Sequence, residues 1–196
     1  MEHDASLWAA VAATFVLAGL VKGMIGLGLP TVAMALLGLV MPPVQAAALL
    51  VVPSLVTNVW QLAAGPRFLA LAGRLWPLLA GIGLGTWGGV GLLDGWSAAE
   101  ARRTLGVILV VYAGLGLTDL HFRVPPAWER WLALPVGVVT GALTLATGMF
   151  VIPAVPYLGA LGLSRDELIQ ALGLSFTVST LTLAVALAAG EPWRRR

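Results

Sequence analysis

The residue best placed to do chemistry is Lys22, the only lysine in the chain. Between Asp4 and Arg67 it is also the only charged residue, and a glycine-rich stretch, 23–30, follows it. A charge inside a membrane segment costs about 2.5–3.5 kcal/mol on insertion scales and usually marks a functional site. Backbone N–H groups freed at a helix break also attract anions. Lys22 therefore predicts a small-anion site; the alternatives are a lysine that snorkels to the interface or one that contacts a lipid or partner.

Glycines mark two places where the predicted helices break. Gly26 and Gly28 follow Lys22, and Gly148 stands at a similar break in the second half of the chain. Because glycine has no Cβ, these positions let the backbone approach either a ligand or a neighbouring helix, and both interpretations stay open. A further set with four-residue spacing favours helix packing: Gly81, Gly85 and Gly89.

Amide and hydroxyl side chains supply the remaining candidates. They suit an oxyanion because they donate hydrogen bonds without adding charge; the alternative is bonding to a neighbouring helix or to the carbonyl four residues earlier. We favour this alternative for Ser175 and Ser179. Asn58 shares a helix face with Ser54 and Gln61, whereas Gln170 and Thr177 share a face with Thr180 on a later helix, and three threonines flank the second break. The candidate substrate-binding residues are therefore Lys22, Gly26, Gly28, Asn58, Thr140, Thr144, Thr147, Gly148, Gln170 and Thr177.

Residue types that are missing exclude several functions. The chain has no cysteine, and no Asp, Glu or His lies inside a predicted membrane segment. Thiolate metal sites, carboxylate proton relays, intramembrane metalloenzymes and aspartyl proteases are therefore not expected. Serine and threonine without a buried histidine or acid form no triad. We expect no catalytic residues, no metal and no cofactor.

The composition places these residues in a membrane. Of 196 residues, 59% are hydrophobic and 10% charged, and the mean hydropathy is +0.95. A soluble globule cannot hide that much apolar surface, and a disordered chain does not contain it. The net charge of +2 comes from thinly scattered basic residues, which excludes nucleic-acid binding. The predicted class is an all-α, polytopic integral membrane protein in a lipid bilayer, with room for roughly six or seven embedded segments.

Proline, glycine and capping signals divide the chain into elements. Ser97 with Glu100, and Ser164 with Glu167, have capping-box spacing and predict helix starts. The region 119–130 is expected to be an interfacial connecting loop. The first segment lacks a basic leader, so we expect a retained helix rather than a cleaved signal peptide. The predicted apolar helices or short segments are 7–22, 31–40, 44–64, 68–93, 97–117, 131–147, 151–161 and 164–189.

Two stretches of the chain resemble each other. Residues 19–26 align with 137–144 at an offset of 118, and Gln45 aligns with Gln170 at an offset of 125. This predicts a first repeat over 1–118 and a second over 131–196, the second lacking about two helices. Paired broken segments mark the binding site of many transporters. We therefore expect 23–30 and 148–153 to be non-helical, buried and close together near the middle of the membrane.

The incomplete second repeat predicts an uncovered surface. We expect the small and hydroxylated face from Gln170 to Thr182 to be exposed to lipid. A second copy of the chain or another membrane subunit would then cover it.

At these motifs the sequence resembles the sulfite exporter TauE/SafE family of membrane transporters. The resemblance lies in 17–30 (LAGLVKGMIGLGLP), 141–153 (GALTLATGMFVIP) and 170–180 (QALGLSFTVST). It implies a multi-pass permease of the bacterial inner membrane, with two related halves, that moves small anions such as sulfite or organosulfonates. Ala35 stands where the family often has proline, and the final helices are absent. The alternative is a truncated, non-transporting membrane subunit or scaffold.

Overall fold

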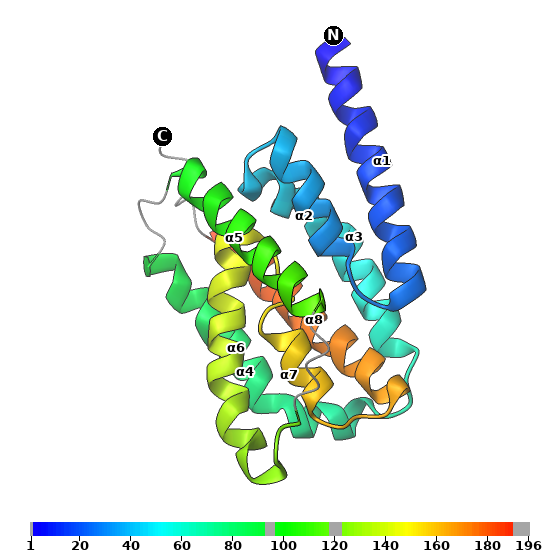
Figure 1. The fold of residues 1–196 in the computed structure, drawn as a ribbon, viewed down its shortest axis with the longest axis vertical. Coiled ribbons are helices and arrows are strands. Elements are labelled where there is room, and N and C mark those ends of the chain that lie inside the picture. The colour runs from blue at the N-terminus through cyan, green and yellow to red at the C-terminus, as the bar shows by residue number, and fades with distance from the viewer. Residues whose placement is uncertain (1, 93–96, 118–122, 190–196) are drawn as a thin grey trace.

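Eight α-helices make up the computed structural model, which describes residues 2–92, 97–117 and 123–189 (Figure 1). The described residues contain no β-strand, which confirms the predicted all-α class. The helices are α1 (Glu2–Ile25), α2 (Leu29–Val40), α3 (Pro43–Ala63), α4 (Phe68–Leu92), α5 (Ala98–Leu117), α6 (Pro126–Thr147), α7 (Ala154–Ala160) and α8 (Arg165–Ala189).

Proline and glycine set many of the helix boundaries. Prolines occupy the first turns of α2, α3 and α6, where the missing N–H group has no helical acceptor to lose. Gly148, with a φ of 71°, ends α6 in the left-handed conformation that glycine adopts readily. Because Pro126 can start a helix, α6 begins inside the region expected to be a connecting loop. Residues 119–122 of that region lie outside the described residues.

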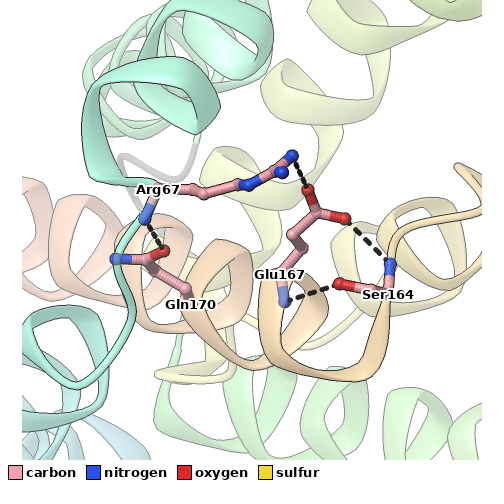
Figure 2. A network of polar contacts seen from close by, with 4 residues as sticks. All are labelled: Arg67, Ser164, Glu167 and Gln170. Carbon is pink, nitrogen blue, oxygen red and sulfur yellow. Dashed lines mark hydrogen bonds and ion pairs between the residues drawn. The ribbon is translucent and has the colours of Figure 1, made fainter.

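Both predicted capping boxes are present. At the start of α5, Ser97 N donates to Glu100 Oε2 at 2.7 Å, and Glu100 N donates to Ser97 Oγ at 3.2 Å. At the start of α8, Ser164 N donates to Glu167 Oε2 at 3.0 Å, and Glu167 N donates to Ser164 Oγ at 3.4 Å (Figure 2). Each pair satisfies backbone donors that have no partner within their helix.

Five of the helices are long and apolar enough to cross a membrane. Large apolar side chains point outward on all of them, as the surface of a protein surrounded by lipid requires. The charged residues near the start of α5 keep that helix out of this group, and α2 is too short. The candidate spans are Ser6–Ile25, Pro43–Ala63, Phe68–Val90, Pro126–Thr147 and Arg165–Ala189.

The most enclosed of these spans is α8. It packs against both α3 and α4, and α4 also packs along α6. Gln170, Ser175 and Thr180 are therefore almost completely buried inside the protein. The expectation that the face from Gln170 to Thr182 is exposed to lipid is wrong, because two helices of the first half cover it.

Close glycine contacts join α4 to α6. A Cβ placed on Gly137 would lie 2.9 Å from Gly81 Cα, and one on Gly141 would lie 2.6 Å from the backbone nitrogen of Thr86. Farther along, a Cβ on Gly89 would meet Ala142 Cα at 3.5 Å. Residue numbers rise together along both helices, so the packing is parallel. This confirms helix packing as the role of Gly81, Gly85 and Gly89.

The two glycine-rich breaks differ in extent. Residues 148–153 are non-helical, as predicted. The first break is shorter than expected, because α1 continues through Gly23 to Ile25 and only residues 26–28 are non-helical. Gly26 and Gly28, with φ of 75° and 109°, make the turn into α2.

The glycines of the two breaks, Gly26 and Gly148, do not lie close together as expected. A Cβ on Gly26 would meet Gln61 near the end of α3, whereas one on Gly148 would meet Ala47 near its start. Fourteen residues of α3 separate these contacts, or about 21 Å along the helix axis. The separation arises because α2 carries the chain back along α3 before α3 begins.

Candidate functional site

Lys22 lies in the last turn of α1 and is only 7% exposed. Its Nζ donates a hydrogen bond to Oδ1 of Asn58, on α3. The side chain is thus directed into the protein rather than along α1 toward an interface. Within the part of the chain that the structure describes, one of its three N–H donors has an acceptor.

The hydrogen-bonded chain continues into α8. Asn58 Nδ2 donates to Thr180 Oγ1 at 3.2 Å, and Thr180 Oγ1 donates to the carbonyl of Phe176 at 2.7 Å. Lys22, Asn58 and Thr180 therefore link three helices through neutral partners. The sequence singled out Lys22 and Asn58 separately, but nothing in their spacing indicated that they meet.

Two aromatic rings border this polar chain, and sequence reasoning missed both. Lys22 Nζ lies 6.0 Å from the centre of the Phe176 ring, at the outer limit of a cation–π contact. The Phe176 and Phe150 ring centres are 5.1 Å apart. Because Phe150 belongs to the second break, that break reaches the surroundings of Lys22 even though Gly148 does not. The available signal was a phenylalanine amid the polar positions of 170–180.

A groove of about 1210 Å³ opens beside Lys22, between α1, α3 and α8. Its lining includes Gly23 and Gly26 from the end of α1 and the first break. Among the described residues, the charged ones in the lining are Lys22 and Arg165, both cationic, and none is a carboxylate. The groove therefore offers positive charge within a mostly apolar wall, a setting that favours an anion.

Gln61 adds a free acceptor to the same groove. Its Nε2 donates to the carbonyl of Ile169 at 2.9 Å, which fixes the orientation of the amide. Its Oε1 is buried and has no hydrogen-bond partner. An unpaired buried carbonyl is costly, so this oxygen marks a place where a hydrogen-bond donor, such as water or an N–H or O–H group of a ligand, can bind.

Gln170, a candidate substrate-binding residue, lies outside the groove and contacts the turn between α3 and α4. Its Nε2 donates to the carbonyls of Leu62 and Gly65 at 2.9 and 2.5 Å. Its Oε1 accepts from Arg67 N at 2.9 Å, as Figure 2 shows. The amide thus holds the turn between α3 and α4. Beside it, Arg67 pairs with Glu167 at 2.7 Å. Gln170 does not line the groove, and its donors and acceptor are engaged.

The candidate threonines bond to their own helices. The hydroxyls of Thr140, Thr144, Thr147 and Thr177 each donate to the carbonyl four residues earlier, at 2.6–2.8 Å. None of the four lines the groove. Bonding to the carbonyl four residues earlier is the alternative to ligand binding that the sequence analysis left open for these threonines.

Two candidate glycines serve packing. A Cβ on Gly28 would lie 3.0 Å from Val21 Cγ1, and one on Gly148 would lie 2.9 Å from Ala47 Cβ. Gly26 does line the groove. The structure thus brings Lys22, Asn58 and Gly26 together, adds Gln61, and places the other candidates elsewhere.

These features define a polytopic α-helical membrane protein with a cationic groove between its helices. The family described as Sulfite exporter TauE/SafE matches residues 11–194, nearly the whole chain. The chain therefore belongs to this family of membrane transporters, as its motifs indicated. Comparison with curated proteins and with solved structures gave no significant match.

Proposed function

We propose that the protein is a permease that moves a small oxyanion, sulfite or an organosulfonate, across the bacterial inner membrane. The proposed anion site is the inner wall of the groove at Lys22 and Gly26. No step of this function requires a catalytic group.

The observation that carries the proposal is the uncompensated charge of Lys22. An ammonium group in an apolar interior is costly unless a counter-charge or hydrogen-bond acceptors surround it. Here the described residues supply one neutral acceptor, Asn58, and no carboxylate to the groove lining. A bound oxyanion would provide both the missing charge and acceptors for the remaining N–H donors.

The neutrality of Asn58 also favours a carrier over a static ion pair. An aspartate at this position would neutralise Lys22 permanently and compete with any anion. An amide fixes the direction of the ammonium while leaving its charge available to a ligand. Arg165 at the groove rim adds a second cation that would attract anions.

A non-transporting membrane scaffold is the second candidate. The hydrogen-bonded chain from Lys22 through Asn58 to Thr180 favours the scaffold, because holding three helices together is by itself a sufficient role for such a chain. The scaffold differs from the permease in one measurable respect: it binds and moves no anion.

Uptake by the purified protein in liposomes would separate the two candidates. Labelled sulfite, sulfate and a small alkylsulfonate would be added outside, with protein-free liposomes as the control. We expect uptake of sulfite or the sulfonate, and competition by the unlabelled anion. Absence of both uptake and binding for the whole panel would favour the scaffold.

A further inference from the structure

The groove beside Lys22 is much larger than an inorganic oxyanion. Its volume is about 1210 Å³, whereas one water molecule takes up about 30 Å³ and drug-sized ligands occupy sites of roughly 300–1,000 Å³. A sulfite or sulfate ion is only a few water molecules in size. Either ion, bound at Lys22, would therefore leave most of the groove wall without contact.

Apolar side chains make up most of that wall. Leu55 and Val59 come from α3, and Ile169 and Leu172 come from α8. Leu172 is 3% exposed and Val59 is 45% exposed, so the wall runs from the interior of the bundle to its surface. A short aliphatic chain along this wall would bury apolar surface, and each methylene group that is buried adds to the affinity.

The two cations of the described lining lie at different levels of α8. Arg165 is the first residue of that helix and is exposed. Lys22 Nζ lies 6.0 Å from the ring of Phe176, which is eleven residues farther along, or about 16 Å along the helix axis. The free oxygen of Gln61 is an acceptor and offsets no negative charge. A compact dianion at Lys22 would keep one charge uncompensated in apolar surroundings, which is costly, so the site favours a monoanion.

The depth of Lys22 also sets the direction of the bound molecule. The start of α8 is the polar end of this span, because Arg165, Asp166 and Glu167 follow one another there. A phospholipid keeps its charged head at the bilayer surface and its chains inside, so it would place its head near Arg165 and hydrocarbon at Lys22. A ligand with its anionic head at Lys22 has the opposite polarity. The buried ammonium therefore fits a water-soluble amphiphile rather than a phospholipid.

We infer that the substrate is a water-soluble monoanion with a short aliphatic tail. Its head binds Lys22, and its tail lies along the apolar wall that α3 and α8 form. The inference rests on the proposed function and narrows its substrate class, because an alkylsulfonate would then be preferred to sulfite or sulfate. Lys22 selects the charge of the ligand, whereas Val59 and its apolar neighbours select the tail.

A homologous series of ligands tests the tail. Sulfite, sulfate, methanesulfonate, propanesulfonate and hexanesulfonate would be bound to the purified protein in phosphatidylcholine nanodiscs, with protein-free discs measured to subtract partition into lipid. We expect affinity to rise about two- to fourfold for each added methylene group, and hexanesulfonate to bind at least about tenfold more tightly than either inorganic ion. Sulfite that binds as tightly as hexanesulfonate would overturn this inference alone. A protein that binds none of the probes would contradict the proposed function as well.

An uncharged ligand and a lysine variant test the head. Hexyl methyl sulfone has the same tail without the charge and should bind at least about tenfold more weakly than hexanesulfonate. In Lys22→Met the two ligands should bind about equally. Equal affinities in the parent protein would show that the groove takes any apolar chain and would overturn the inference. Loss of hexanesulfonate binding in discs with anionic phosphatidylglycerol, at high salt to screen the surface charge, would assign the groove to lipid instead.

A matched pair of valine variants tests contact between the tail and the wall. Val59→Ser makes the wall more polar, whereas Val52 is exposed on the same face of α3 but does not line the groove, so Val52→Ser is the control. We expect Val59→Ser to lower the affinity for hexanesulfonate about two- to fivefold and to leave that for methanesulfonate unchanged. Val52→Ser should change neither affinity. An equal loss for both ligands, or in both variants, would contradict the proposed position of the tail.

Discussion

Lys22 of α1 donates a hydrogen bond to Asn58 of α3, so the only lysine in the chain is held by a neutral amide. Asn58 in turn donates to Thr180 of α8 at 3.2 Å, which sets the orientation of the amide and directs its oxygen toward the ammonium. The arrangement fixes the position of a cation without neutralising it. In the permease hypothesis the charge of Lys22 binds the anion, whereas in the scaffold hypothesis Lys22 only holds helices together. Substitutions at Lys22 and Asn58 distinguish the two hypotheses.

Replacing Lys22 tests whether its charge binds the anion. Lys22→Met keeps an unbranched stem, and the lost charge-assisted hydrogen bond of about 1.5–3 kcal/mol predicts a loss of roughly 10- to 150-fold in affinity. Lys22→Arg should recover only part, because a planar guanidinium needs more room. Anion binding would be measured at equal protein amounts. Arg103→Met, which removes an exposed cation on α5, is the control. An unchanged anion affinity of the Lys22→Met variant would contradict the proposed role of Lys22.

Asn58→Asp separates a structural role of Lys22 from a functional one. The aspartate has nearly the shape of asparagine and can form an ion pair with Lys22, so helix packing should be kept. The same pair competes with the substrate, and we expect a loss of about tenfold or more in anion affinity. Thermal stability and anion binding would be measured on the same preparation. A stable Asn58→Asp protein that binds anions normally would indicate that Lys22 serves packing alone.

Gln170 should matter for stability because of the turn that it holds. Gln170→Ala leaves the carbonyls of Leu62 and Gly65 without their partner and should cost about 1–3 kcal/mol. Gln45, which aligns with Gln170 in the repeat but is exposed, supplies the matched control Gln45→Ala. Thermal unfolding in detergent would compare the two variants. Equal melting temperatures would show that the turn does not depend on the amide.

The sequence predicted much of the helical framework because its determinants are local. Proline at the first turn of a helix, glycine with positive φ after its end, and serine–glutamate capping boxes each act within a few residues. They located the start of α3, the end of α6 and the starts of α5 and α8. The start of α6 was misplaced because Pro126 can begin a helix as readily as it can belong to a loop.

The candidate site was harder to predict because its contacts are not local. Gln170 was proposed as a ligand from its residue type, but its partners lie more than 100 residues earlier, in a turn whose position depends on how α3 and α8 pack. Gln61 was noted for its helix face alone, and only the groove gives its free oxygen a role. Sequence spacing identifies polar faces, whereas the choice between neighbour and ligand requires the packed helices.

The glycine contact between α4 and α6 gives the sharpest test of the fold. A Cβ at position 141 would lie 2.6 Å from the backbone nitrogen of Thr86, where no flexible side chain can move aside. Gly141→Ala should therefore separate the two helices and cost about 1–3 kcal/mol or more. Gly83→Ala, on the open side of α4, adds the same methyl group without a clash.

We expect Gly83→Ala to be neutral or to stabilise the protein by up to about 1 kcal/mol, because alanine restricts the unfolded chain. Thermal unfolding and the yield of monodisperse protein in detergent would be compared for both variants and the parent chain. The parallel packing of α4 on α6 predicts a large difference between the two alanine variants. Similar melting temperatures would contradict that contact.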